Sequence, residues 1–415
     1  MVIMERRSST DSDDTSWSSA ATGEASAAVV ASLSDDMMAE IIRRLPVDSV
    51  ARSKCVSKAW CATVSDGYLR RRLPLQLSVV YFPDDDDAAA SARGKARPRF
   101  ACADSAAGGG GMLRDRDLGF FPFLDVSVVS DACNGLLLLR AAGTRRFYVV
   151  DPVTRRWAAL PPPSKDPRLS MLAFDPSSSS SASSCRGGGG GYHVINFTGR
   201  WRDRGGEVEV FSSETRAWAL RDAEFGVPAA SLSGSVHFHA GAVYVLASDP
   251  DCVVRMDVAS AGSGGDLACA VAELPEHADG VDGRLAHSAG RLHYVASDGA
   301  RLLKVWVLDG ELPALRWRLK HAVRLGDDVV EGGRCCGGRR GEARVLALHP
   351  EKDAVYVWSA WKLRLLEYDL ARKELTGAWA LGEGGRNRVV KTWLVPSSMY
   401  LSDCLPLPDA QVQQC

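Results

Sequence analysis

The sequence contains no apolar run close to the roughly 20 residues that a membrane-spanning helix needs. Its 415 residues include 50 Lys and Arg against 51 Asp and Glu, a formal net charge of -1. Without a concentrated basic charge, there is no electrostatic basis for binding nucleic acid or an acidic membrane surface. The amino-terminal residues also lack the apolar segment of a secretory signal. We therefore expect no nucleic-acid or membrane partner, and a location in the cytoplasm, the nucleus or both.

The 11 cysteines show no CxxC spacing of the kind found in zinc sites and redox motifs. An odd number without a secretory signal favours free thiols in a reducing compartment, where most would be small core residues. The GxSxG and HExxH motifs are absent, and the glycine run 187–191 lacks the Lys-Ser/Thr of a phosphate-binding loop. The sequence thus predicts no metal, no cofactor and no catalytic residue.

The histidines give no clear metal motif. His237 and His239 alternate along a predicted strand and share one face, but no third ligand follows at a recognisable spacing. We favour ordinary packing or surface roles for both, and interpret His287 and His293 in the same way. Acidic residues are scattered through turns, so the sequence nominates no carboxylate pair for acid–base chemistry.

Residues 32–73 have the pattern of three short helices. Ser34 can cap the first helix, and Pro46 ends it because proline disfavours helical conformation in the residue before it. Apolar residues in between fall at spacings of three and four and form one stripe: Met37, Met38, Ile41, Ile42 and Leu45. A second helix, capped by Asp48 or Ser49, would carry on its apolar side Cys55, Val56, Ala59 and Trp60. A segment of about 40 residues is near the lower limit for an independent core, so we expect exposed apolar surface that marks a partner site.

The order of residues in this segment resembles the F-box, a helical module that docks onto a Skp-family adaptor in ubiquitin ligases. The matching residues are Leu33, Asp36, Glu40, Ile41, Ile42, Leu45, Pro46, Val50, Arg52, Val56, Lys58 and Trp60. Ser34, Ser53 and Ser57 stand where the family often has proline, phenylalanine and cysteine, and these serines reduce the apolar area of the docking face. The alternative is a helical hairpin that serves only as a structural cap.

The resemblance implies binding to a Skp-family adaptor and, through it, to a cullin. The residues expected to contact the adaptor are Leu33, Ile41, Ile42, Leu45, Pro46, Val50, Val56, Lys58 and Trp60.

From residue 134 onward the chain contains five copies of a weak sequence repeat, at intervals of roughly 50 residues. Each unit has an apolar strand, a turn, a second strand ending near an aspartate, and then an aromatic residue or leucine. Short strands with regular turn signals favour an all-β sandwich, barrel or propeller, and a repeat of this length favours the propeller. Trp157 and Trp218 follow their turns at matching offsets, and we interpret both as core residues. Strands near 77–82 and 391–401 would close a ring of about six blades.

This part resembles the F-box-associated, kelch-like domain of plant F-box proteins. The phrases that carry the resemblance are Cys133-Asn134-Gly135-Leu136, DPVTRRWAALPP and VEVFSSETRAW. Asp151 stands where the family has asparagine, and most units lack a clear kelch double glycine.

The expected fold is therefore a small all-α F-box of three helices followed by an all-β propeller-like domain. We expect a disordered tail over 1–28, the F-box over 29–73, the propeller over 74–403, and a carboxy-terminal tail over 404–415. Low-complexity loops are expected near 84–111, 177–191 and 332–341.

These resemblances imply the substrate-recognition subunit of an SCF-type ubiquitin ligase. Its F-box would bind the adaptor, and its propeller would bind a protein target for ubiquitination without catalysing any step itself. One alternative is a propeller enzyme or ligand-binding protein acting on a sugar or small metabolite, with the helical segment as an accessory. Another is an adaptor-binding protein that never recruits the ubiquitination machinery.

Overall fold

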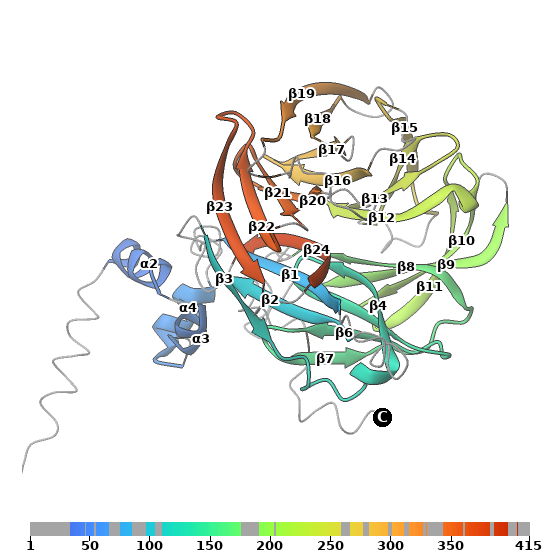
Figure 1. The fold of residues 1–415 in the computed structure, drawn as a ribbon. Helices are drawn as coiled ribbons and strands as arrows, with labels where there is room; N and C mark the ends of the chain where they lie inside the picture. The colour runs from blue at the N-terminus through green and yellow to red at the C-terminus, as the bar shows by residue number, and fades with distance from the viewer. Residues whose placement is uncertain are drawn as a thin grey trace, which may run out of the picture. The chain divides into compact units, whose positions relative to one another are not determined.

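A computed structural model of the chain contains two compact units, Met1–Leu69 (unit 1) and Arg70–Cys415 (unit 2), each considered separately below (Figure 1). The structure describes residues 34–45, 47–53, 55–65, 75–84, 97–103, 110–175, 191–202, 205–258, 266–276, 282–297, 301–310, 315–326, 329, 343–359, 362–381, 386–396 and 405. The predicted tail over 1–28, nearly all of the tail over 404–415, and the predicted loop over 332–341 lie outside these residues, as does most of the loop over 177–191. Within the described helices, none is long and apolar enough to cross a membrane.

Unit 1 contains helices α2 (Asp35–Arg43), α3 (Val47–Ser53) and α4 (Lys58–Ser65). As predicted, Ser34 caps α2, and its hydroxyl accepts a hydrogen bond from the Met37 backbone N–H at 3.3 Å. Helix α4 contacts both α2 and α3. Among the described residues of this unit, the buried apolar side chains are Met38, Ala39, Ile42, Val50 and Val64. They form the small shared core that holds the helices together.

The sequence analysis placed Cys55 to Trp60 on the second helix, but this helix ends before them. Helix α3 ends at Ser53, and the next residues turn, with the Val56 N–H bonded to the Ser53 carbonyl at 3.1 Å. The hydroxyl of Ser57 then accepts the Trp60 N–H at 3.2 Å and caps α4. A serine that satisfies an amide of the next turn starts a new helix, so Cys55 and Val56 lie in the connection rather than on a helical face.

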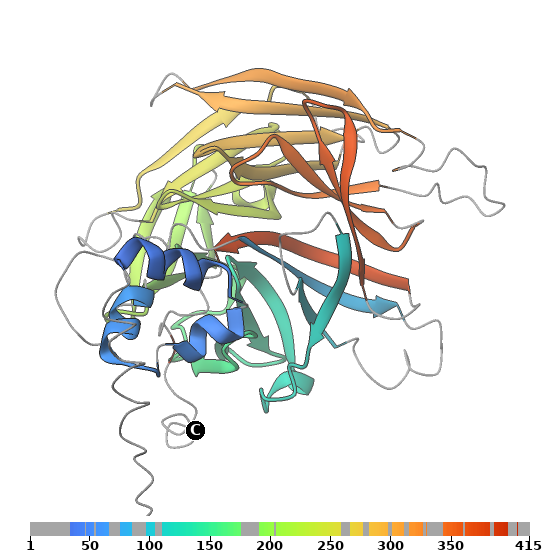
Figure 2. The same cartoon turned by 90° about the vertical axis from the view of Figure 1, so that its left-hand side faces the viewer.

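The described part of unit 2 consists of β-sheets that follow one another along the chain, and four of them are four-stranded and antiparallel (Figures 1 and 2). The first sheet comprises β4 (Ser127–Cys133), β5 (Leu136–Ala141), β6 (Phe147–Asp151) and β7 (Arg156–Ala159). The second comprises β8 (Pro167–Phe174), β9 (Tyr192–Arg202), β10 (Gly205–Ser212) and β11 (Ala217–Glu224). The third comprises β12 (Leu232–His239), β13 (Ala242–Ala247), β14 (Cys252–Asp257) and β15 (Cys269–Glu273). The fourth comprises β16 (Asp282–Ser288), β17 (Arg291–Ser297), β18 (Leu302–Asp309) and β19 (Arg316–Arg324).

The remaining strands form an eight-stranded sheet with two halves. One half comprises β20 (Ala343–Leu348), β21 (Ala354–Ser359), β22 (Arg364–Asp369) and β23 (Glu374–Leu381). The other half comprises β24 (Arg386–Pro396), β1 (Leu75–Asp84), β2 (Arg99–Ala103) and β3 (Gly110–Arg116). A parallel pairing of β23 with β3 joins the halves.

The closing strands predicted near 77–82 and 391–401 do pair, because β24 is antiparallel to β1 along its whole length. The carboxy-terminal strand therefore completes the sheet that the first strands of the unit begin. Consecutive contacts run from β4 through β8, β12, β16 and β20 to β24, so the first strands of the first five groups and β24 lie nearest the centre of the unit. This arrangement agrees with the expected propeller-like domain.

The expected loop over 84–111 was wrong in part, because it contains β2 and the start of β3. Alanine and glycine gave this stretch the composition of a loop. Residue 110 is glycine for a structural reason, because a Cβ atom there would lie 2.5 Å from the carbonyl oxygen of Ala378 on β23. The close approach of β3 to β23 therefore requires glycine at this position, and the same glycine made the stretch look like a loop in the sequence.

The two tryptophans lie in aromatic clusters between sheets and turns. Trp157 is 9% exposed, and its ring lies 5.7 Å from that of Phe121 between centroids. Trp218 is half-buried, packs on Phe211 at 5.4 Å, and donates a hydrogen bond from Nε1 to the Pro161 carbonyl at 2.6 Å. Since Pro161 follows β7, Trp218 ties the second sheet to the first.

Candidate functional site

Unit 1 exposes large apolar side chains beside its small core. Met37 is 55% exposed, Ile41 42% and Val56 66%. Met37 and Ile41 are four residues apart on α2 and therefore lie on the same side of the helix. We use the name helical patch for these three exposed residues of the helical unit, Met37 and Ile41 on α2 and Val56 in the turn before α4. A helical unit that leaves such residues outside its core offers an apolar surface to another protein.

The structure describes seven of the nine residues predicted to contact an adaptor, and these seven differ in exposure. Ile41, Val56 and Lys58 are exposed, while Leu45 and Trp60 are half-buried. Ile42 is fully buried and Val50 is 2% exposed, so both hold the helices of unit 1 together. Leu33 and Pro46 lie outside the described residues. Met37 belongs to the predicted apolar stripe but is not among the predicted adaptor contacts, because those follow from the residues that match the family pattern.

The three serines that depart from the family pattern each have a local structural role. Ser34 and Ser57 cap α2 and α4, as described above. Ser53 is 5% exposed, and its hydroxyl donates to the Val50 carbonyl at 2.7 Å. Each hydroxyl thus has a partner within its own helix or at its end, which removes the cost of an unpaired polar group.

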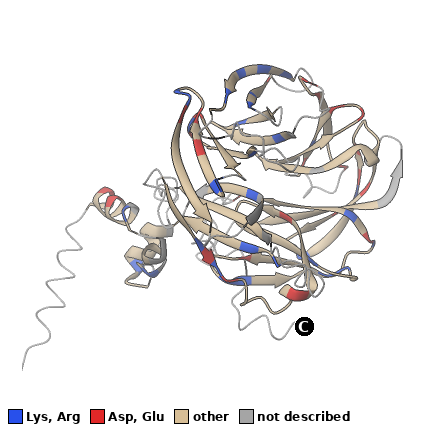
Figure 3. Cartoon of the chain, in the orientation of Figure 1, with Lys and Arg blue, Asp and Glu red and all other residues tan. Residues whose placement is uncertain are grey.

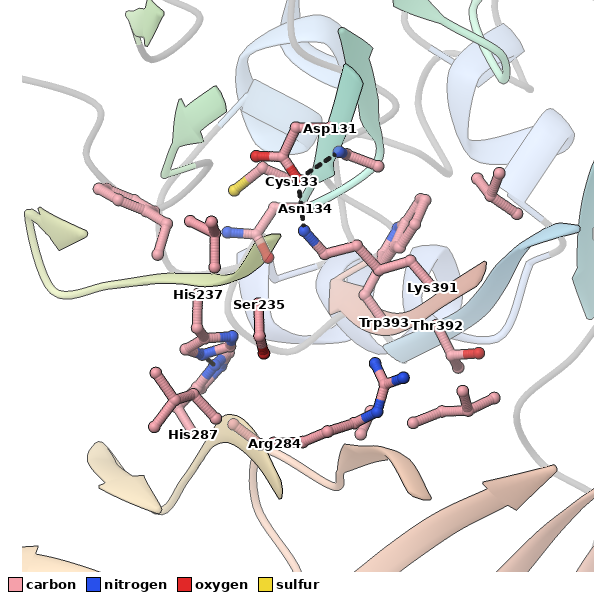
Figure 4. Close-up of a pocket in the computed structure, with 18 of the residues that line it drawn as sticks. Asp131, Cys133, Asn134, Ser235, His237, Arg284, His287, Lys391, Thr392 and Trp393 are labelled. Atoms are coloured by element: carbon pink, nitrogen blue, oxygen red, sulfur yellow. Dashed lines mark hydrogen bonds and ion pairs between the residues drawn. The ribbon is translucent and has the colours of Figure 1, made fainter. Parts of the chain in front are cut away.

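Unit 2 has a central cavity of about 240 Å³ among its inner strands (Figure 4). The strands that contribute lining residues are β1, β4, β12, β16, β20 and β24. The polar and charged lining residues are Ser130, Asp131, Cys133, Asn134, Ser235, His237, Arg284, His287, Lys391 and Thr392. Residues far apart in sequence therefore meet at one place only because the sheets surround a common centre.

Asp131 joins three inner strands at the edge of this cavity. Its Oδ1 atom accepts from the ammonium group of Lys391 on β24 at 2.8 Å, and its Oδ2 atom accepts from the Leu172 N–H on β8 at 2.8 Å (Figure 4). The Asp131 side chain is 12% exposed and that of Lys391 is 29% exposed. One carboxylate thus connects β24 to β4 and β4 to β8.

Two histidines from different sheets form a direct pair. The distance from His237 Nε2 to His287 Nδ1 is 3.0 Å, and the His239 ring stacks on His287 with centroids 4.8 Å apart. Burial, helped by neighbouring histidines, holds the pKa of His237 well below its usual value and lowers that of His287 to about 4. Both rings are therefore neutral near pH 7, and one N–H donates to the other ring. Among the residues that the structure describes, no group of three or more His, Cys, Asp or Glu is placed to hold a metal ion.

The Cys-Asn-Gly phrase forms the turn between β4 and β5. Asn134 and Gly135 have positive φ angles of 44° and 96°, a conformation that asparagine and glycine adopt most readily. The Asn134 amide donates to the Phe174 carbonyl at 2.7 Å, which fixes the end of β8. Burial raises the pKa of Cys133 to about 12, so this residue is a neutral thiol. Its chemistry is that of a core residue rather than a nucleophile.

Charged residues of both signs are interspersed over the sheets of unit 2 (Figure 3). A basic series lies on β19, the outer strand of its sheet: Arg316, Arg318, Lys320 and Arg324. Arg318 is paired with Asp309 at 2.7 Å, and Lys320 is paired with Asp353. Acidic neighbours thus offset part of the charge on this edge.

Comparisons with known proteins match both units. Residues 31–72 match the family described as F-box domain, and residues 122–388 match the family described as F-box protein At3g26010-like, beta-propeller. The chain is 24% identical over 363 residues to "F-box protein At3g26010" of Arabidopsis thaliana, covering 80% of this chain and 77% of the relative. It is 31% identical over 147 residues to "Putative F-box protein At1g12855" of the same plant, covering 32% of this chain and 31% of the relative. Among solved structures, the one titled "Crystal structure of Nidogen/Laminin Complex" aligns with a TM-score of 0.42 at 10% identity, covering 77% of this chain and 99% of that chain.

Proposed function

This chain belongs to the F-box proteins with an At3g26010-like β-propeller, and from that premise we propose that it is a substrate receptor of an SCF-type ubiquitin ligase. The observation that carries the proposal is the combination of an F-box exposing an apolar helical patch with a separate propeller domain in one chain. The first would hold a Skp-family adaptor, and the second would hold a protein target.

On the adaptor side, the exposed and half-buried residues supply the contact area. Ile41, Val56 and Lys58 are accessible, with Leu45 and Trp60 at the margin of the core. Ile42 and Val50 act by keeping α2 and α3 in the arrangement that presents these side chains. Leu33 and Pro46 complete the proposed contact set, and the adaptor in turn links the chain to a cullin.

On the target side, we propose a six-bladed propeller in which each half of the eight-stranded sheet is one blade. Loops carried by such a scaffold can vary without disturbing the core, which suits target recognition. Ubiquitin transfer would belong to the partner enzyme, while this chain would raise the effective concentration of the target near it. The chain would act in the cytoplasm, the nucleus or both.

The alternative of a propeller enzyme finds less support in the cavity. Asp131 is the one carboxylate among its described lining residues, and Lys391 and the Leu172 N–H already occupy both of its oxygens. Acid–base hydrolysis of a sugar would need two carboxyl groups facing one substrate.

The test is co-purification of the full-length chain with a Skp-family adaptor and a cullin. An Ile41→Asp/Val56→Asp variant places two charges on the helical patch, and we expect it to lose the adaptor. Arg44→Gln is the control, because it removes an exposed ion pair with Glu40 while leaving the three apolar side chains of the patch in place. If the double variant retains the adaptor as well as wild type does, the proposed docking surface is wrong. If the adaptor binds but no cullin is recovered, the chain binds an adaptor outside a ubiquitin ligase.

A further inference from the structure

The outer edge of β19 has no partner strand among the described residues. β19 is the last strand of the fourth sheet and pairs with β18 on one side only (Figure 1). On its other side, no hydrogen bond joins its backbone to any described part of the chain. A strand exposed in this way presents a row of N–H and C=O groups to another extended segment.

The outer strands of the other sheets are shorter, and most have a partner at their backbone. β23 pairs with β3. On β11 the Asp222 carbonyl accepts the Leu267 N–H at 2.9 Å, and on β15 the Glu273 carbonyl accepts Nε1–H of Trp317 at 2.7 Å. β7 has only four residues, whereas β19 has nine and is the longest of the five outer strands. β19 is therefore the edge best suited to receive a further strand.

The formal charges on β19 are all positive. Its residues include four Lys or Arg and no Asp or Glu (Figure 3). Arg316 and Arg324 are exposed, and neither forms an ion pair with an acidic residue that the structure describes. Leu319 lies between them and is 42% exposed. Like charges oppose pairing of this edge with a second copy of itself, whereas an acidic strand would be attracted.

A row of alternating charge crosses the fourth sheet and ends at β19. Arg291 on β17 pairs with Asp309 on β18 at 2.8 Å, and Arg316 on β19 lies directly opposite Asp309. Asp309 also accepts a hydrogen bond from Arg318 at 2.7 Å, so this one carboxylate lies among three arginines. Opposite charges that face each other across neighbouring strands stabilise their pairing. An Asp or Glu on a further strand, opposite Arg316, would continue the row.

We propose that the outer edge of β19 binds an extended acidic segment of another protein. This segment adds to the fourth sheet as a further strand and places a carboxylate opposite Arg316. Main-chain hydrogen bonds supply affinity, and the arginines select acidic side chains. The proposal goes beyond the role as a ubiquitin-ligase receptor. It concerns unit 2 alone, so it stands or falls independently of adaptor binding by unit 1.

The test is fluorescence anisotropy of the labelled peptide acetyl-Thr-Glu-Val-Asp-Val-Glu-Thr-amide, titrated with the full-length chain. We expect saturable binding, and at least tenfold weaker binding of the counterpart in which Gln and Asn replace the acidic residues. Methylation of every second backbone nitrogen removes the donors from one edge of the peptide. Of the two peptides methylated in alternate registers, one should bind like the parent and the other should not, because a strand added to β19 uses one edge only.

Arg316→Glu should weaken binding of the acidic peptide about tenfold, because an attractive cross-strand pair becomes repulsive. The same variant should bind a peptide with lysine at the acidic positions more tightly than wild type does. Arg168→Glu is the matched control, because it makes the same change of charge at an exposed arginine on β8, in the second sheet. It should bind the acidic peptide like wild type.

The proposal is overturned if the acidic peptide does not bind, if its uncharged counterpart binds equally well, or if the two methylated peptides bind alike. Equal weakening by Arg316→Glu and Arg168→Glu would also overturn it, because binding would then depend on net charge alone. Sedimentation of the chain without peptide tests the other possible occupant. A dimer that Arg316→Glu dissociates would assign the edge to a second copy of this chain and would likewise overturn the proposal.

Discussion

We expect the ion pair between Asp131 and Lys391, which joins β4 to β24, to contribute measurably to the free energy of unfolding of unit 2. Breaking a buried pair by removing one partner typically costs about 3–5 kcal/mol, since the remaining charge stays buried. Lys391 retains 29% exposure of its side chain, so we expect Asp131→Asn to cost less, about 2–3 kcal/mol. The asparagine oxygen can still accept the Leu172 N–H, so the loss comes mainly from the stranded ammonium group.

The double-mutant cycle separates this pair from other effects of the substitutions. Lys391→Met leaves the carboxylate without its cation, whereas Asp131→Asn/Lys391→Met removes both charges. We expect the double variant to be less destabilised than the two single effects added together, with a coupling of about 1–3 kcal/mol.

The assay is thermal unfolding of the full-length chain monitored by calorimetry. At about 2.1 cal/mol/K of unfolding entropy per residue, a loss of about 2–3 kcal/mol in a unit of roughly 350 residues corresponds to a fall in Tm of about 3–4 °C. The reasoning is refuted if Asp131→Asn unfolds within 1 °C of wild type, or if the two single effects simply add.

Three further predictions follow from local geometry. Ser57→Ala removes the cap of α4 and should cost about 1 kcal/mol, raising hydrogen exchange of the Trp60 amide about fivefold; unchanged exchange would show that the cap contributes nothing. Burial lowers the pKa of His293 to about 4, below the ~6.5 of the unfolded chain, so the unfolded state takes up the proton first. The corresponding stability is therefore present above pH 6.5 and lost as the pH falls toward 4, by about 2–3 kcal/mol. Urea unfolding at pH 7 and 4.5 should show a smaller loss in His293→Gln than in wild type, and equal losses would contradict the assignment. Gly110→Ala should lower Tm by several degrees because its Cβ would meet a β23 carbonyl at 2.5 Å, whereas Gly111→Ala, whose Cβ meets nothing within 4 Å, should change it less.

The sequence predicted the repeat because its signals are local. Asp151 accepts hydrogen bonds from the Val153 and Thr154 amides within its own turn. Asp369 accepts them in the same way from the Ala371 and Arg372 amides. Turns of this kind recur along the chain, and they can be recognised without knowing which sheets meet. The same holds for Ser34, whose hydroxyl caps the helix that begins directly after it.

The centre of unit 2 could not be predicted in this way. Asp131 and Lys391 are 260 residues apart, and His237 and His287 are 50 residues apart. Neither pair has a sequence motif, because each arises only when strands of different sheets become neighbours. The helical patch lies between these cases: its stripe was visible, but only the packing of α4 against α2 shows that Ile42 faces inward while Met37 faces outward.

The pairing of β24 with β1 has a consequence for synthesis of the protein on the ribosome. Strands β1 to β3 are made early, yet their sheet gains its inner strand only when residues 386–396 have been translated. At about 5–20 residues per second, the intervening chain of roughly 300 residues takes on the order of 15–60 seconds to make. During that interval the edge of β1 has no β24 to bond and can pair with other chains. Nascent chains that stall before residue 386 should therefore be those that chaperones retain and that aggregate most readily.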